Sequence, residues 1–307
     1  MSTGLSSAPA VQQMAGKGAA RAYSRKQKHA SYGPNRRPRW YTYALLTLFI
    51  LVCFYPLWYA VLLASSDAAS IAQHPIPSLI PEGNLFTNIN RVLNADINFW
   101  QAVINSIIVA VITSISVVFF STLAGYAFSK LRFRGRDGLL VFIIATMAVP
   151  TQLGVVPLFI VMSNLGWTGK LVSVIVPAMV TAFGVFWMTQ YLRDALPFEL
   201  IEAARVDGCS MIRTFVSVAL PAARPAAAML ALFTFVGSWT NFFWPSIVLG
   251  ANNPTLPVAL KLLQASYFKD YSLIMAGVVV STVPLILLFV FAGKQLVSGI
   301  MQGAVKG

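Results

Sequence analysis

Six long apolar runs limit what this chain can fold into. They cover residues 41–64, 102–128, 138–162, 171–192, 226–249 and 273–296. Each is near or above the roughly 20 residues that a helix needs to cross the ~30 Å apolar core of a bilayer. The runs contain no acidic side chain, and their one basic side chain, Lys294, lies near the end of the last run. The sequence therefore predicts an all-α, polytopic membrane protein with six transmembrane helices.

Composition supports a membrane protein, and the first run needs a separate argument. Of the 307 residues, 57% are hydrophobic and 10% are charged, whereas about 25% of the residues in a soluble domain are charged. A cleaved signal peptide is the alternative for residues 41–64. Its apolar core would have only about 7–15 residues and a short basic lead-in. We therefore interpret this run as a retained transmembrane helix.

The basic residues predict which segments face the cytoplasm. If the N-terminus is cytoplasmic, 18 of the 22 Lys and Arg residues lie in cytoplasmic segments and 4 lie outside. This bias fits the positive-inside rule. It predicts that both termini and residues 193–225 are cytoplasmic. Residues 1–39 hold eight basic and no acidic side chains, which is typical of a disordered basic tail. Residues 40–307 form the predicted transmembrane domain.

The net charge of +13 could indicate a protein that binds nucleic acid. Attraction to the lipid bilayer surface explains a basic run beside a transmembrane helix without any such partner. We therefore expect the lipid bilayer and no nucleic acid as the counterpart of these charges.

The sequence offers no residues for catalysis or for holding a cofactor or metal. It has no G-x-x-x-x-G-K-[ST] phosphate-binding loop. Its two histidines, His29 and His74, fall on opposite sides of the membrane, and Cys53 and Cys209 are far apart in sequence. Ion-coupled carriers usually bear ionisable groups within the membrane. Their scarcity here weighs against an ion-coupled secondary carrier, which stays open as an alternative, as does a non-transporting membrane scaffold.

One of the few polar segments long enough to form a structure outside the bilayer lies between two apolar runs, at residues 193–225. Its pattern predicts an amphipathic helix that contains Glu199 and Glu202, a bend at Gly208, and a second helix from Ser210 to Leu220. We expect Pro221 and Pro225 to end the second helix, because proline lacks an N–H and clashes with the preceding turn.

This segment resembles the EAA loop of ABC-transporter permeases. The matching residues are Glu202-Ala203-Ala204, Gly208, Ala219 and Leu220-Pro221. Further matches resemble the carbohydrate branch of that family, to which the maltose permeases belong: Asp207-Gly208, Trp239-Thr240-Asn241 and Gly303-Ala304-Val305-Lys306-Gly307. The resemblance covers most of the chain from about Trp40 onward.

The resemblance implies a type I ABC importer permease fold in the cell membrane of a prokaryote. The implied function is the permease subunit of an ATP-driven importer of di- or oligosaccharides. The implied partners are a homologous second permease subunit, two copies of a cytoplasmic ATPase subunit that bind the ATP, and an extracellular sugar-binding protein.

The resemblance also assigns residues to coupling with the ATPase. They are Glu199, Glu202, Ala203, Ala204, Asp207, Gly208, Leu220 and Pro221. Glu202 would pair with a basic residue of the ATPase, the two alanines would permit close approach, and Gly208 would set the turn.

A second group of residues suits a sugar path. Sugars are bound by aromatic faces and by neutral hydrogen-bonding groups. The candidates, within or near apolar runs, are Asn105, Trp239, Asn241, Phe242 and Trp244. The alternative is that the aromatic residues are interfacial or core residues and that the amides hydrogen-bond between helices.

Overall fold

The computed structural model describes residues 39–73, 79–264 and 270–304, with side chains to residue 293. Every regular element within these ranges is a helix. The chain falls into two units, residues 1–56 and residues 57–307. Residues 1–38 of the expected basic tail lie outside the described residues, so that tail stays a prediction.

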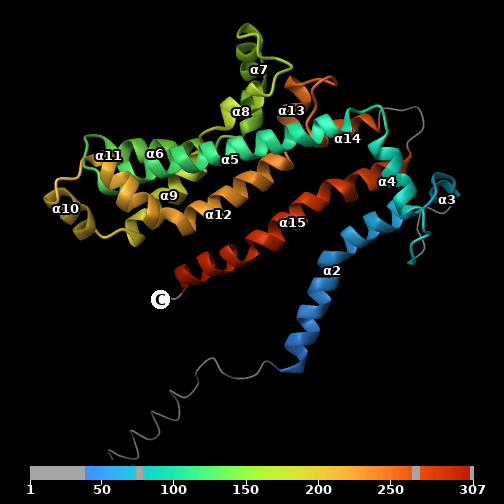
Figure 1. Cartoon of the computed structure of the whole chain (residues 1–307), viewed down its shortest axis with the longest axis horizontal. Coiled ribbons are helices and arrows are strands. Elements are labelled where there is room, and N and C mark those ends of the chain that lie inside the picture. Colours follow the sequence, from blue (N-terminus) through green and yellow to red (C-terminus); the bar gives the residue numbers. More distant parts are fainter. Residues whose placement is uncertain (1–38, 74–78, 265–269, 305–307) are drawn as a thin grey trace, which may run out of the picture. The chain divides into compact units, whose positions relative to one another are not determined.

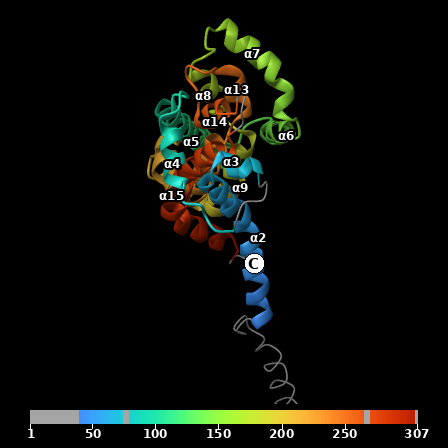
Figure 2. The same cartoon turned by 90° about the vertical axis from the view of Figure 1, so that its right-hand side faces the viewer.

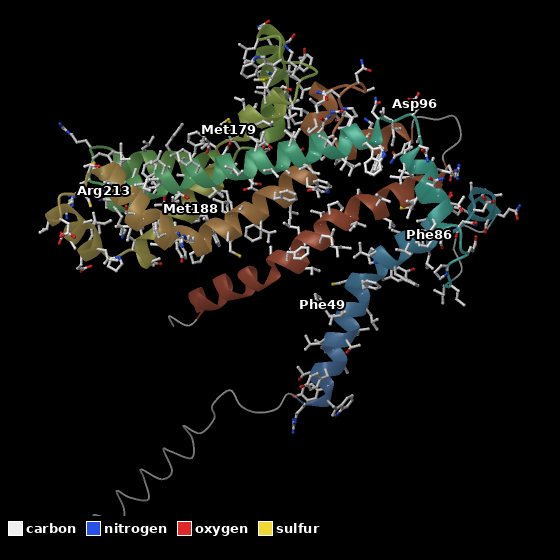
Figure 3. All side chains as sticks on the ribbon, viewed as in Figure 1. Phe49, Phe86, Asp96, Met179, Met188 and Arg213 are labelled. Atoms are coloured by element: carbon white, nitrogen blue, oxygen red, sulfur yellow. The ribbon has the colours of Figure 1, made fainter. Side chains whose placement is uncertain are left out.

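In the first unit, the described residues form the beginning of α2 (Trp40–Ser65). Apolar side chains are exposed all around this stretch, as at Phe49 (Figure 3). A helix that is apolar on every side suits a lipid environment.

One buried core of the second unit lies between α5 (Phe99–Lys130), α9 (Ala182–Ala195) and α12 (Leu220–Trp239), which lie side by side (Figure 1). Met188 of α9 is fully buried among them. At Gly125 of α5, an added Cβ would lie 2.8 Å from the backbone of Met188. A small residue is required at this crossing, as is common where membrane helices pack closely.

Five described helices are long and apolar enough to cross a membrane, and a sixth span is possible if one bent pair counts as one. The bent pair replaces the expected straight run at 138–162. It consists of α6 (Arg136–Thr146), followed by η1 (Thr151–Gly154) and α7 (Val155–Asn164), with a bend of 89° (Figure 2). Pro150 precedes η1, and proline disfavours a helical conformation at the residue before it. Five of the six predicted spans are single helical stretches, and the sixth corresponds to this bent pair.

The run expected at 226–249 begins earlier and ends earlier. Its helix runs from Met211 to Trp239 through α11 (Met211–Thr214), the π turn η2 (Phe215–Ala219) and α12. The expectation that Pro221 and Pro225 end the second helix was therefore wrong. In the π turn the Leu220 N–H bonds to the Phe215 carbonyl, and this wider turn lets the helix continue past a proline that has no N–H.

Several short helices lie at the two ends of α5 (Figure 1). One end carries α4 (Leu85–Leu93) and α14 (Leu256–Leu262), and α3 (Ala68–Gln73) lies beside the start of α15 (Tyr271–Ala304). The other end carries α10 (Phe198–Val206) and α11. The segments predicted to lie on opposite sides of the membrane thus lie at opposite ends of the long helices.

An ion pair joins α4 to the start of α15. The Arg91 guanidinium donates to Asp270 over 2.7 Å. Burial acts to raise the pKa of Asp270. Hydrogen bonds from Ser272, the Leu273 N–H and Arg91, together with the Arg91 charge, outweigh burial and hold that pKa below its usual value. The carboxylate therefore stays ionised and caps α15.

Candidate functional site

The bend between α10 and α11 depends on Gly208. Its φ is +76°, in the left-handed region. The Gly208 N–H donates to the Arg205 carbonyl over 3.0 Å, and the Cys209 N–H donates to the Ala204 carbonyl over 2.9 Å. These two bonds close the end of α10 as a Schellman motif, for which glycine is favoured because it has no Cβ. The structure thus places Gly208 at the turn that the sequence predicts.

The inner face of α10 packs against the long helices. Ile201 and Ala204 are buried, and Ile201 joins a cluster with Leu196 and Phe215. The ring of Phe215 lies 5.7 Å from that of Tyr126 in α5, centroid to centroid. The hairpin of α10 and α11 is thereby attached to the ends of α5 and α12.

The outer face of this hairpin combines acidic and apolar side chains. Glu199, Glu202, Ala203 and Asp207, all predicted coupling residues, are exposed. Beside them, Val206 is 87% exposed and Ile212 is 78% exposed; Met211 is exposed too. Neither Glu199 nor Glu202 forms an ion pair within the described part of the chain. Apolar side chains this exposed at the tip of a polar segment are typical of a docking surface.

Three predicted coupling residues lie apart from this surface. Ala204 is buried on the inner face of α10, where it cannot provide the expected close approach to a partner. Leu220 and Pro221 are half-buried at the first turn of α12, directly after the π turn. They are placed to shape the helix that follows the hairpin rather than to lie on its exposed tip.

A second candidate site is a cavity of about 300 Å³ between α5, α8 (Val172–Ala178), the start of α9 and α12. Of the predicted sugar-path residues, Asn241 lines it. The rest of the lining is neutral: Thr113, Val174, Ala178, Thr181, Phe183, Leu230, Phe233, Thr234, Gly237 and Ser238.

Three hydroxyl groups that line this cavity form no side-chain hydrogen bond within the described part of the chain, whereas the Thr181 hydroxyl accepts from the Gly184 N–H. Thr113 is 3% exposed, and its Oγ1 has no partner among the described residues. Thr234 and Ser238 likewise form no side-chain bond within the described ranges. By contrast, Ser114 and Thr122 of α5 each donate to the carbonyl four residues earlier, over 2.6 Å. Unpaired polar groups are costly inside a membrane, so the cavity suits a polar, uncharged occupant.

The other predicted sugar-path residues lie elsewhere. Asn105, Trp239 and Trp244 each donate a side-chain hydrogen bond to a backbone carbonyl of a distant segment. The respective acceptors are Pro254 at 2.8 Å, Ser281 at 3.2 Å and Ser173 at 2.9 Å. These contacts match the alternative in which amides and indoles join helices.

Phe242 lies just beyond the end of α12. The ammonium group of Lys261 lies 5.2 Å from the centroid of its ring. The expectation that residues 239–244 lie within a span was wrong, because α12 ends at Trp239 and α13 (Phe243–Val248) is a separate short helix.

The unpartnered hydroxyls and the position of Lys130 were not anticipated from the sequence. Serine and threonine are frequent in apolar helices, and only the fold shows which of them lack a carbonyl acceptor. Its position in the sequence assigns Lys130 to a charged loop between two apolar runs, but the structure shows that its side chain is buried. Within residues 39–73, 79–264 and 270–304, no group of three or more His, Cys, Asp or Glu side chains is placed to hold a metal ion.

Comparison with known proteins identifies relatives over most of the chain. The family described as "Binding-protein-dependent transport system inner membrane component" matches residues 118–298. The arabinooligosaccharides transport system permease protein AraQ of Halalkalibacterium halodurans is 34% identical over 68% of this chain and 75% of its own length. The lactose transport system permease protein LacG of Rhizobium radiobacter is 29% identical over 88% of this chain and 97% of its own.

A solved structure shows the same fold. It is a chain from a bacterial ABC transporter involved in the import of the acidic polysaccharide alginate. The two chains superimpose with a TM-score of 0.70 and 26% sequence identity, over 82% of this chain and 94% of that chain.

Proposed function

The chain belongs to the family of binding-protein-dependent transport system inner membrane components, as a permease subunit of carbohydrate ABC importers, and we propose that residues 193–225 couple sugar import to cytoplasmic ATPases. It is a multi-pass membrane protein with the ABC importer permease fold. The proposal concerns what this chain's own residues contribute to such an importer.

The observation that carries the proposal is the exposed tip of the α10–α11 hairpin. Val206 and Ile212 extend into solvent beside Glu202 and Asp207. A short helix with apolar anchors and small residues suits a groove on a partner protein. Ala203 is exposed and small enough for close approach, and the free carboxylate of Glu202 can pair with a basic group of that partner.

Charge placement supports a cytoplasmic location for this hairpin. The bias of 18 basic residues to 4 supports a cytoplasmic location for the hairpin, for the basic tail at 1–39 and for both termini. The ends of the long helices that bear α4 and α14 then face outward. There they can receive solute from an external sugar-binding protein.

The proposed assembly contains this chain, a homologous second permease subunit and two copies of the ATPase subunit. ATP is bound by the ATPases, because this chain has no phosphate-binding loop. Closure of the ATPases around ATP draws the two docked hairpins together and turns the pore outward. This chain therefore acts as a non-catalytic transport subunit.

The sugar path is proposed to pass the cavity at Asn241. Its free amide and the unpartnered hydroxyls of Thr113, Thr234 and Ser238 suit the hydroxyl groups of an uncharged sugar ring, while Phe183 and the other apolar lining residues suit its C–H faces. Asn105, Trp239, Trp244 and Phe242 lie outside this cavity and are not part of the proposed path.

Purification of the tagged full-length chain in mild detergent tests the coupling proposal. Mass spectrometry is expected to find an ATPase, a second permease and a binding protein in the eluate. Val206→Asp is expected to lose the ATPase and keep the second permease, because it places a charge in the docking surface. Phe86→Asp is the matched control at the opposite end, where Phe86 of α4 is equally exposed (Figure 3). Retention of the ATPase by Val206→Asp at the wild-type level would show that α10 is not the docking helix.

A further inference from the structure

Lys130 is a buried cation at the end of α5. It is 4% exposed, and among the residues whose burial is described it is the one buried charged side chain. Its neighbours Arg132 and Arg134 are exposed. Burying an ammonium group is costly unless it is compensated by hydrogen bonds or charges. The groups that offset the cost of burying the Lys130 ammonium group therefore show which segments this side chain joins.

Lys130 contacts two other helices. Its Nζ donates to the carbonyl of Arg193 over 3.2 Å, and the same Nζ lies 4.7 Å from the ring centroid of Phe198. Arg193 lies in the last turn of α9, where the final carbonyls have no helical partner and the helix dipole favours a cation. Phe198 is the first residue of α10, and an ammonium group over its ring gains a cation–π attraction.

The charges around Lys130 favour this position. Asp194 and Glu199, which flank the junction of α9 and α10, attract its ammonium group, and Arg193 repels it. One side chain of α5 thus bridges the end of α9 and the beginning of α10.

The remaining attachment of α10 differs in kind. Its inner face is held by apolar contacts through Ile201 and the cluster that contains Leu196. Apolar contacts are non-directional, so they allow a helix to rotate or slide over its neighbours. A hydrogen bond to a carbonyl and a cation held over a ring fix both the position and the orientation of the start of α10.

We propose that Lys130 is a positioning residue that makes α10 and the adjacent end of α5 move as one body, so that displacement of the docked hairpin reaches the transmembrane helices. This inference rests on the proposed docking of α10 on an ATPase. It goes further by assigning the transmission step to a residue outside residues 193–225.

A distance measurement within the assembled importer tests the proposal. Spin labels are attached at Leu123→Cys on α5 and Leu200→Cys on α10, both exposed, after the two native cysteines are replaced by serine. Distance distributions are recorded for the complex without nucleotide and after trapping with MgATP and vanadate. If the two helices move together, the unaltered Lys130 background gives one narrow distribution that is the same in both states.

Three substitutions in the labelled background decide the outcome. Lys130→Met keeps the length of the side chain and removes the charge, and it is expected to broaden the distribution at least about twofold and make it differ between the two states. Lys130→Arg keeps a cation that can donate to the carbonyl and stack on Phe198, and it is expected to restore the narrow distribution. Arg134→Met removes an exposed cation from the same loop and is expected to change nothing.

The proposal is overturned if Lys130→Met leaves the distribution unchanged, or if Lys130→Arg is as broad as Lys130→Met. If Lys130→Met does not assemble, Phe198→Leu decides in the same way, because it removes the ring and leaves the carbonyl contact. Failure of the proposed function is separately visible, since no ATPase would then accompany the chain with an intact Lys130. An unchanged distribution in an assembled complex would count against the role of Lys130 alone.

Discussion

Substitution of Gly208 measures how much the shape of the hairpin contributes to docking. The φ of +76° at Gly208 is imposed by two hydrogen bonds that close the end of α10. No heavy atom lies within 4 Å of the position that an added Cβ would occupy. A substitution therefore introduces backbone strain without a steric clash, and its effect can be estimated from the conformation alone.

The left-handed conformation costs a non-glycine residue about 1–2 kcal/mol. We expect the substituted hairpin to relax out of this turn when unbound, so that docking must restore the turn. Because each 1.4 kcal/mol corresponds to a factor of about ten in affinity, Gly208→Ala should weaken ATPase binding by up to about five- to thirtyfold. Gly208→Asn should cost less, about threefold at most, because asparagine tolerates this region. Gly208→Pro should abolish coupling, since proline cannot reach positive φ and lacks the N–H that bonds to Arg205.

The assay is titration of the detergent-solubilised permease pair with the purified ATPase, followed by fluorescence anisotropy. Gly135→Ala is the matched control. Gly135 also has a positive φ, +81°, and open space around its Cβ position, and it precedes α6 in a different loop. It should suffer similar local strain without loss of ATPase affinity.

The order of the series is the test of the reasoning. If alanine and asparagine at 208 weaken binding equally, or if alanine has no effect, the turn does not need its left-handed conformation for docking. Equal losses for Gly135→Ala and Gly208→Ala would attribute the effect to general destabilisation.

Three further predictions concern the packing, the outer ion pair and the cavity. Gly125→Ala places a methyl group 2.8 Å from the backbone of α9 and should lower the melting temperature through overpacking of about 1–3 kcal/mol, whereas Gly138→Ala, at an open helical position, should raise it slightly. Burial acts to raise the pKa of Asp270, but hydrogen bonds from Ser272, the Leu273 N–H and Arg91, with the Arg91 charge, outweigh burial and lower that pKa from its ordinary 3.8. The ionised carboxylate should therefore stabilise the protein above pH 3.8 and lose that effect as the pH falls through the lowered pKa. Thermal unfolding of Asp270→Asn against pH should lack this dependence. Asn241→Leu should reduce sugar uptake at least about tenfold and leave ATPase recovery unchanged, and normal uptake by this variant would exclude the cavity from the path.

Much of the architecture could be predicted because it follows from strong local signals. The long apolar runs predict the spans, since uninterrupted apolarity at helical length has few alternatives in a folded chain. Gly208 between two amphipathic stretches predicts the hairpin, since positive φ is largely confined to glycine.

The errors arose at prolines, whose effect depends on the turn around them. Pro150 breaks its span with a bend of 89°, whereas the helix passes through Pro221 and Pro225. The π turn directly before Pro221 lets this helix continue. No residue type in the sequence predicts that π turn. A proline in the sequence therefore predicts a distorted helix, but it does not predict whether the helix ends or continues.

Candidate site residues could be predicted where they belong to one continuous segment, and could not be predicted where they come from distant segments. Glu202, Ala203 and Gly208 belong to one continuous segment, and the pattern of that segment reveals them. The cavity brings Thr113 of α5 together with Asn241, and Lys130 meets Phe198 only because α5 returns to the end of α9. Contacts between segments this distant depend on the packing of three helices, which the sequence pattern alone does not specify.

Uptake by reconstituted liposomes tests the central claim most directly. The complex recovered with this chain is inserted into liposomes, and radiolabelled lactose and arabinooligosaccharides are offered outside together with the binding protein. The account predicts that at least one of these sugars accumulates only when the ATPase-facing side has MgATP, and that Val206→Asp abolishes accumulation. Accumulation by this chain without any ATPase, driven by a proton or sodium gradient, would contradict the account and favour an ion-coupled carrier.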